Sequence, residues 1–386
     1  MKIDAMVKRE NFYSINEKTL EDYYKFVHGI KLKVKTSNYS LMRKVFIYPK
    51  INAIVTRKPS SSVIKYLLAE FNVRTSIIKF ILGKIYTFAC LYSGGVLSSK
   101  ALVFSGHNPM TDSILVLPCN RKIRIIDFDN QHVDSIIKEG FTRKYFDNEL
   151  SFRQKSKYPF VPPILLNGDS WYREPLLKGQ PLARVSDSKQ YALSSKMAID
   201  HIGVIGRDTL HFVDSEQYAR KLLNHIKALV PLAEKNKHIR YGQVLLDVSE
   251  QAFSTTNQLP DNIPTAMTHG DFQSGNIWVD PVENKTFLID WETAAVRSIW
   301  YDPATLLLST RRHNGVINMV TACESQHVMD SVLINDPNKN YHMGAVMGIL
   351  LLEDLIFYLE DNLELPEDWG GDLIDKYASQ LKNIKW

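Results

Sequence analysis

The chain has 386 residues, of which 45% are hydrophobic and 23% are charged, and its formal net charge is +5. These values are typical of a globular protein of two or three domains, and they exclude a largely disordered or fibrous chain. The three cysteines form no Cys-x-x-Cys pair, which argues against a disulfide framework or a structural zinc site. The first residues, MKIDAMVKRENFYS, contain no apolar signal segment, so we predict a cytoplasmic protein.

Positive charge is concentrated in the N-terminal part of the chain. Residues 1–111 hold 18 lysines and arginines against 6 acidic residues, a balance of +12, whereas residues 112–386 hold 29 against 36. This split predicts a basic accessory region over 1–111. Two interpretations stay open: peripheral contact with an anionic membrane surface, or a solvated basic surface. We expect no nucleic-acid binding, because no RNA-binding or zinc-finger pattern accompanies the basic residues.

The first half of the chain predicts one apolar helical segment followed by a run of strands. Apolar residues at helical spacing over 62–82 predict a helix that packs on a core or lies at a membrane interface. Turn-forming residues over 105–113 indicate a boundary. Beyond it we expect strands over 113–118, 122–127 and 132–138, a helix over 141–154 and a strand pair within 159–177.

The second half is mainly helical from about residue 188. Amphipathic helices are expected over 217–233 and 243–255, from 305 onward and over 345–364, with short strands within 268–279 and 286–291. We therefore predict an α+β fold. Its parts are a basic region (1–111), a small β-rich lobe (112–178) and a larger helical lobe (179–386), with a cleft between the lobes.

The segment THGDFQSGNIWVDPVENKTFLIDWE, residues 268–292, is the most informative one. It places Asp271, Asn276 and Asp290 at a spacing that suits phosphoryl transfer from a nucleotide–magnesium complex. That chemistry needs one carboxylate facing the acceptor hydroxyl, and an amide and a second carboxylate holding the metal. A loop that begins at Asp271 can turn Asn276 toward the same cleft, and Asp290 ends an apolar strand.

These residues, HGDFQSGN (269–276) with IDWE (289–292), resemble the aminoglycoside phosphotransferase and choline kinase-like family, whose fold is that of protein kinases. Gly270 and Gln273 stand where the protein-kinase catalytic loop has Arg and Lys, which favours the small-molecule kinases. Family members often have His-Pro at Gln273-Ser274. The resemblance implies that Asp271 is catalytic, that Asn276 and Asp290 hold Mg²⁺, and that His269 braces the loop.

The resemblance also implies a lysine that binds the nucleotide phosphates and pairs with a glutamate on the following helix. The predicted order of elements places Lys138 and Glu149 in these positions, with Lys122 and Lys100 as further candidates. The segment WYREPLLKG, which contains Glu174, resembles the family's hinge between the lobes, where the backbone contacts the nucleotide base. The turn expected to cover the phosphates, residues 118–121, contains no glycine.

The function implied is that of a small-molecule kinase. It would transfer the γ-phosphate of ATP or GTP, with Mg²⁺, to a hydroxyl of an amino sugar, a sugar, a choline-like compound or a lipid-linked saccharide. Residues 344–386 hold nine acidic residues against three lysines, which fits either a site for a cationic acceptor or a solvated helical face. The alternative function, favoured by the glycine-free turn, is a catalytically silent nucleotide-binding scaffold that docks at a membrane.

Overall fold

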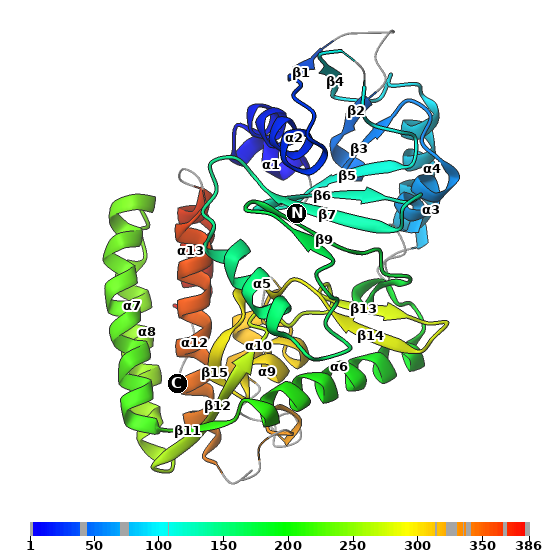
Figure 1. The fold of residues 1–386 in the computed structure, drawn as a ribbon. Helices are drawn as coiled ribbons and strands as arrows, with labels where there is room; N and C mark the ends of the chain where they lie inside the picture. Colours follow the sequence, from blue (N-terminus) through cyan, green and yellow to red (C-terminus); the bar gives the residue numbers. More distant parts are fainter. Residues whose placement is uncertain are drawn as a thin grey trace. The chain divides into compact units, whose positions relative to one another are not determined.

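The computed structural model describes residues 3–38, 45–69, 77–106, 108–312, 315–321, 330–334, 336, 341–365 and 369–382. Its contacts group the chain into two compact units (Figure 1). Unit 1 comprises residues 1–194 and 278–292, and unit 2 comprises residues 195–277 and 293–386. The segment 268–292 therefore supplies residues to both units.

Unit 1 is built on one antiparallel sheet, in which the strands follow the order β1-β4-β2-β3-β5-β6-β7-β9-β8. Adjacent strands pair through registers such as Ile54 opposite Val116 and Lys122 opposite Ile137. The strands are β1 (Val34–Ser37), β2 (Val45–Tyr48), β3 (Ala53–Thr56), β4 (Lys100–Phe104), β5 (Ile114–Pro118), β6 (Lys122–Asp127), β7 (His132–Ile137), β8 (Leu166–Asn167) and β9 (Trp171–Pro175).

Two helix pairs cover the two faces of this sheet (Figure 1). Because successive side chains of a strand point to opposite faces, Ile47 packs with α1 (Ile3–Arg9) and α2 (Phe12–His28), whereas Phe46 and Tyr48 pack on the other side. On that other side lie α3 (Ser61–Ala69) and α4 (Ile77–Tyr92). The sheet is therefore buried on both faces, which explains the continuous apolar sequence of β2 and β3.

The strands and helices expected over 113–177 are present in the structure. Strands β5, β6 and β7 begin and end within one residue of the predicted bounds, and the predicted helix is α5 (Lys144–Lys155). Of the single helix expected over 62–82, the structure describes α3 and α4, and residues 70–76 between them lie outside the described part.

A smaller sheet completes the strands of unit 1. It contains β10 (Gln180–Pro181), β13 (Ile277–Asp280) and β14 (Lys285–Leu288) in the order β10-β13-β14. Strand β14 leads directly into Asp290, and α6 (Ser188–Asp208) begins in this unit and continues into unit 2.

Unit 2 is mainly helical and contains a three-stranded sheet. Helix α12 (Met343–Leu363) packs against three helices (Figure 1), which are α7 (Ser215–Lys237), α8 (Gly242–Thr255) and α13 (Trp369–Leu381). Because α12 is surrounded in this way, its apolar residues are buried on nearly all sides. The sheet has the order β11 (His211–Asp214), β12 (Asn262–Thr268), β15 (Ala295–Ser298). The remaining α-helices in the described part of the unit are α9 (Tyr301–Leu307) and α10 (Gly315–Thr321).

The two units differ from the three predicted parts of the chain, which were divided at residues 111 and 178. The sheet runs without interruption from strands before residue 111 to strands after it, because β3 pairs with β5. Residues 1–111 thus contribute four strands and four α-helices to unit 1 within the described ranges. Among the described helices, none is both long and apolar enough to cross a bilayer.

Candidate active site

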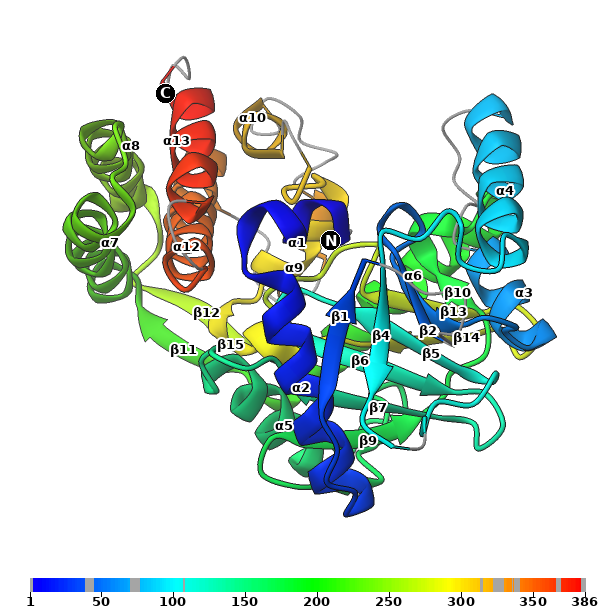
Figure 2. The ribbon, with the colours of Figure 1, turned by 90° about the horizontal axis from the view of Figure 1, so that it is seen from above.

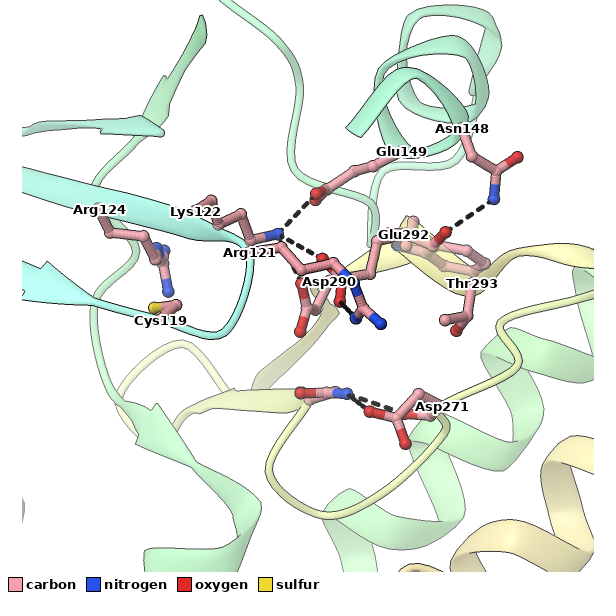
Figure 3. A network of polar contacts seen from close by, with 12 residues as sticks. Cys119, Arg121, Lys122, Arg124, Asn148, Glu149, Asp271, Asp290, Glu292 and Thr293 are labelled. Carbon is pink, nitrogen blue, oxygen red and sulfur yellow. Dashed lines mark hydrogen bonds and ion pairs between the residues drawn. The ribbon is translucent and has the colours of Figure 1, made fainter. Parts of the chain in front are cut away.

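In unit 1, three carboxylates surround the side chain of Lys122 at the start of β6 (Figure 3). Its Nζ lies 2.7 Å from Oε2 of Glu149 and 2.6 Å from Oδ1 of Asp290. Oε2 of Glu292 is 3.5 Å away. One oxygen from each of these carboxylates lies within 4.8 Å of the other two. We call these four residues the Lys122 cluster.

Lys122, Glu149 and Glu292 are at most 15% exposed, whereas the Asp290 side chain is 34% exposed. The low exposure of the first three strengthens the electrostatic interactions of the cluster. Burial alone would lower the pKa of the Lys122 ammonium. The carboxylates of Asp290 and Glu149 outweigh burial and hold this pKa well above its ordinary value, so Lys122 is charged. Burial and the nearby charge of Asp290 raise the pKa of Glu292 to about 7, against the opposing effect of Lys122. The cluster thus contains one positively charged ammonium, that of Lys122, and three carboxyl groups.

The local backbone presents Asp290 and Glu292 to this cluster. Asp290 has a φ of 70°, a left-handed conformation that is uncommon for residues other than glycine and that is found at functional sites. The indole of Trp291 is buried and stacks on Phe152 of α5 at 4.1 Å between ring centroids. Asn148, also on α5, donates a hydrogen bond of 2.9 Å to the backbone oxygen of Glu292 (Figure 3). Helix α5 therefore holds this segment through both its aromatic and its polar side chains.

The donor set of the Lys122 cluster fits magnesium. Mg²⁺ prefers oxygen ligands and is commonly bound by one or two carboxylates with water and phosphate oxygens completing the octahedron. Glu149, Asp290 and Glu292 offer such oxygens at mutually compatible distances. Of the predicted magnesium pair, Asp290 belongs to unit 1 and Asn276 to unit 2, and their joint role stays a prediction.

Glu149 pairs with Lys122, not with Lys138, which corrects the predicted pair. The Nζ of Lys138 donates to Oε1 of Glu10 at 2.5 Å and to the backbone oxygens of Cys119 and Asn120. The reason is the strand register. Ile137 lies opposite Lys122 and shares its face of the sheet, so the next residue along β7, Lys138, points to the opposite face. Lys100, the other candidate, places its Nζ over the ring of Tyr13.

Glu174 lies in a buried ion network next to the cluster. Its carboxylate accepts from Nη2 of Arg124 at 2.9 Å and from Nη2 of Arg153 at 2.6 Å. Burial would raise its pKa, but the two arginines outweigh burial and lower it, so the carboxylate is ionised. Arg153 also donates to Oε1 of Glu149 at 3.1 Å. Glu174 thereby supports Glu149 through a shared arginine, and its predicted contact with a nucleotide base stays a prediction.

In unit 2, the loop after β12 is held by buried hydrogen bonds. The Asp302 carboxylate accepts from the backbone N–H of His269 at 2.6 Å and from that of Gly270 at 2.9 Å. Gly270 has a φ of 84°, and a Cβ there would lie 2.3 Å from the backbone oxygen of Thr293. The ring Nδ1 of His269 accepts from the backbone N–H of Asp271 at 3.3 Å. These contacts agree with a bracing role for His269 and explain why the following residue is a glycine.

Side chains from the same loop and from further along the chain converge on Asp271. Its Oδ2 accepts from the side-chain amides of Gln273 and Asn276, each at 2.8 Å, and its Oδ1 accepts from Nε of Arg311 at 3.2 Å. The structure therefore brings Asp271 and Asn276 together, as the spacing predicted. The Asp271 side chain is 20% exposed, so it is not fully buried by these contacts.

Arg311 links Asp271 to the acidic C-terminal part of unit 2. Its guanidinium donates to Oδ1 of Asp354 and at 2.6 Å to the hydroxyl of Tyr301, and it lies 3.7 Å from the centroid of the Phe357 ring. Asp354 also accepts from Tyr377 at 2.7 Å. Asp354 and its neighbour Glu353 are buried and bonded within the unit, so these two residues do not belong to a solvated helical face. A site for a cationic acceptor in the acidic segment stays a prediction.

Two arginines near these groups were not identified from the sequence. Arg121 precedes Lys122, and its Nη1 donates to Oε1 of Glu292 at 3.2 Å while its guanidinium lies over the ring of Tyr145. Arg121 was a detectable candidate, since it lies in the glycine-free turn. Arg311 follows Asp271 by 40 residues in a segment without any motif, so no local signal marks it.

Comparison with known proteins supports the predicted resemblance. Residues 168–322 match the sequence model described as "Phosphotransferase enzyme family". This part of the chain is similar in sequence to that family. The predicted resemblance and the kinase-like α+β fold class are thereby confirmed. A search of curated proteins finds no match to the sequence.

Solved structures with low sequence identity are also similar. The ethanolamine kinase of Plasmodium vivax is 14% identical over 87% of this chain and 96% of its own, with a TM-score of 0.45. The macrolide 2'-phosphotransferase MphH of Brachybacterium faecium is 14% identical over 73% and 96%, with a TM-score of 0.47. Choline kinase of Cryptosporidium parvum is 13% identical over 71% and 90%, with a TM-score of 0.40.

Proposed function

We propose that this protein is a small-molecule kinase that transfers the γ-phosphoryl group of ATP or GTP to a hydroxyl group, in the cytoplasm. The observation that carries the proposal is the Lys122 cluster, in which one buried ammonium is bonded to Glu149 and Asp290 and has Glu292 close by. A lysine fixed by a glutamate beside a metal-binding carboxylate is the constellation that kinases use on the donor phosphates.

The roles on the donor side follow from charge and geometry. Lys122 is positively charged and held by Glu149, so its Nζ is suited to contact phosphate oxygens. Asp290 would hold Mg²⁺, which when bound neutralises charge on the β- and γ-phosphates, and Asn276 stays the second ligand predicted from the sequence. Arg121 adds a second cation at the turn before β6 and would contact the phosphates in place of glycine backbone amides.

The role on the acceptor side belongs to Asp271. Its carboxylate is oriented by Gln273, Asn276 and Arg311, and it would accept the proton of the acceptor hydroxyl as the oxygen–phosphorus bond forms. The bond between the γ-phosphorus and the bridging oxygen breaks at the same time, and the nucleoside diphosphate leaves. Much of the rate enhancement would come from orientation and from charge neutralisation.

A transfer assay tests this function directly. Purified protein, Mg²⁺ and ATP or GTP are incubated with amino sugars, neutral sugars, choline-like amino alcohols and lipid-linked saccharides, and phosphorylated product is measured. We expect one class to be phosphorylated and Asp271→Asn to lower turnover by roughly 10²–10⁴-fold. Asp261→Asn, at an exposed position of the same unit, is the control. Nucleotide binding without transfer to any class would contradict catalysis and favour the scaffold alternative.

A further inference from the structure

Helix α4 exposes a continuous apolar stripe on the surface of unit 1. Six large apolar residues of this 16-residue helix have exposed fractions between 50% and 66%. They recur at intervals of three and four residues and therefore line one side of the helix. They are Ile78, Ile81, Leu82, Ile85, Phe88 and Tyr92. Single exposed apolar residues are ordinary on protein surfaces, but a contiguous patch of this kind indicates a contact surface.

The opposite side of α4 is anchored, so the orientation of the stripe is fixed. Thr87, Cys90 and Leu91 are buried, and Cys90 and Leu91 belong to the apolar core between α3, α4 and the sheet. Within the stripe, the rings of Phe88 and Tyr92 stack at 4.2 Å between centroids. Figure 2 shows α4 standing at the margin of the sheet of unit 1, with the rest of that unit on one side of it only.

The stripe continues past the end of the helix. Val96 and Leu97 lie in the turn that follows α4, and their exposed fractions are 82% and 44%. The turn is fixed by backbone hydrogen bonds from Val96 to Ser93 and from Ser98 to Gly95. An apolar surface therefore extends over the whole length of α4 and onto the next turn.

The charge of the surrounding sequence is almost entirely positive. Residues 23–111 contain 14 lysines and arginines and a single acidic residue, Glu70. Helix α4 contains Lys79 and Lys84 and no acidic residue. Exposed apolar side chains combined with a basic sequence are features of helices that lie in the interface of an anionic membrane.

We propose that α4 docks unit 1 on a lipid bilayer with anionic headgroups, with the apolar stripe inserted at the boundary between headgroups and acyl chains. At 16 residues the helix is shorter than the ~20 needed to cross a bilayer, so it would lie parallel to the surface. A second copy of this chain is a poorer occupant, because pairing two such faces would bring two strongly basic regions together. Nucleic acid would match the charge but would leave the apolar stripe in water.

A vesicle sedimentation experiment tests the proposal with the full chain. Vesicles of phosphatidylcholine alone are compared with vesicles containing about 30% phosphatidylserine. The test variant is Ile85→Glu/Phe88→Glu, and the control is Val282→Glu, whose side chain is 92% exposed on the β13–β14 turn. Because all three positions are exposed, the variants should keep the wild-type melting temperature, which is checked first.

We expect the wild type and Val282→Glu to sediment with the anionic vesicles and to be released by high salt. The double variant should bind at least tenfold more weakly, because two charges replace inserted apolar side chains. Equal sedimentation of the wild type and the double variant would overturn the proposal, as would equal binding to neutral and anionic vesicles. A wild-type dimer that becomes monomeric in the double variant, without vesicle binding, would show that a second copy covers α4. None of these outcomes depends on phosphoryl transfer.

Discussion

The ammonium of Lys138 lies 2.5 Å from a carboxylate oxygen of Glu10, and both side chains are fully buried. Glu10 directly follows helix α1, so this pair connects the N-terminal helix to the end of β7. Lys138 also donates to the backbone oxygens of Cys119 and Asn120, in the turn that precedes Lys122. Residues 3–10 are thus a structural part of the unit that carries Lys122.

Removing one partner of this pair should destabilise the fold. Glu10→Leu removes the carboxylate bonded to the buried Lys138 ammonium, and Lys138→Met leaves the buried Glu10 carboxylate with Arg9 alone, at 3.6 Å. Breaking a buried pair typically costs about 3–5 kcal/mol, whereas the double substitution should cost much less than the sum. Urea unfolding of the four proteins measures the coupling. The control is Lys18→Met, which removes an exposed pair with Glu139 at 3.8 Å and should cause no measurable loss. Additive effects of the two buried substitutions would contradict the pairing.

Lys122 and Lys138 should differ in nucleotide binding. Lys122→Met removes the cation expected to contact the phosphates, and a hydrogen bond to a charged group is worth about 1.5–3 kcal/mol, so the Kd for magnesium–nucleotide should rise by roughly 10–100-fold. Lys138→Met should change the Kd little at a temperature where it is folded. Isothermal titration of both variants measures the difference. A larger effect of Lys138→Met than of Lys122→Met would favour the pair predicted from the sequence.

The loop that carries Asp271 should tolerate a side chain at Gly275 and not at Gly270. A Cβ at Gly270 would lie 2.3 Å from Thr293 O in a backbone of φ 84°, whereas nothing lies within 4 Å of one at Gly275. We expect Gly270→Ala to lower the free energy of unfolding by at least about 2 kcal/mol and Gly275→Ala to lower it by much less. Thermal unfolding compares them. Equal stability of the two variants would mean that the turn at Gly270 is not as the structure describes it.

Glu353 should make the stability of the protein depend on pH. Burial raises its pKa to about 7, although Ser298 and Tyr218 donate hydrogen bonds to its carboxylate. Between the unfolded value of 4.5 and 7, the folded protein holds a proton that the unfolded chain has lost, so stability falls as pH rises through this range.

The substitution Glu353→Gln isolates this effect. The stability of the wild type relative to Glu353→Gln should fall by up to about 3 kcal/mol between pH 4.5 and pH 7, because one pKa unit corresponds to 1.36 kcal/mol. Denaturant unfolding at a series of pH values measures it, with Glu216→Gln at an exposed position as the control. Parallel pH profiles of wild type and Glu353→Gln would show that Glu353 stays ionised in the folded protein.

The sequence was informative where structure is local. Strands β5, β6 and β7 were predicted within one residue, because each is a short apolar run bounded by turn residues. The loop that carries Asp271 was identified because Asp271 and Asn276 are five residues apart, and the structure shows that the two side chains are hydrogen-bonded. Both kinds of pattern depend on neighbouring residues alone.

What the sequence did not predict depends on contacts between distant residues. Strand β3 joins the sheet by pairing Ile54 with Val116, and no periodic pattern reports such a pairing. Whether Lys122 or Lys138 pairs with Glu149 depends on which face of the sheet each side chain occupies. The register between β6 and β7 determines that face. Arg311 reaches Asp271 across 40 residues through the packing of unit 2, with no motif at its own position.

The most direct test of the proposed function is magnesium-dependent stabilisation by nucleotide of the wild type and of Asp290→Ala. Glu283→Ala, an exposed position in the preceding β13–β14 turn, is the control. At a hundredfold excess over Kd, ATP or GTP should raise the free energy of unfolding by about 2.7 kcal/mol in the wild type and the control, only with magnesium. Asp290→Ala should lose this increase. The same stabilisation in Asp290→Ala, or none in the wild type with either nucleotide, would contradict a donor site at the Lys122 cluster.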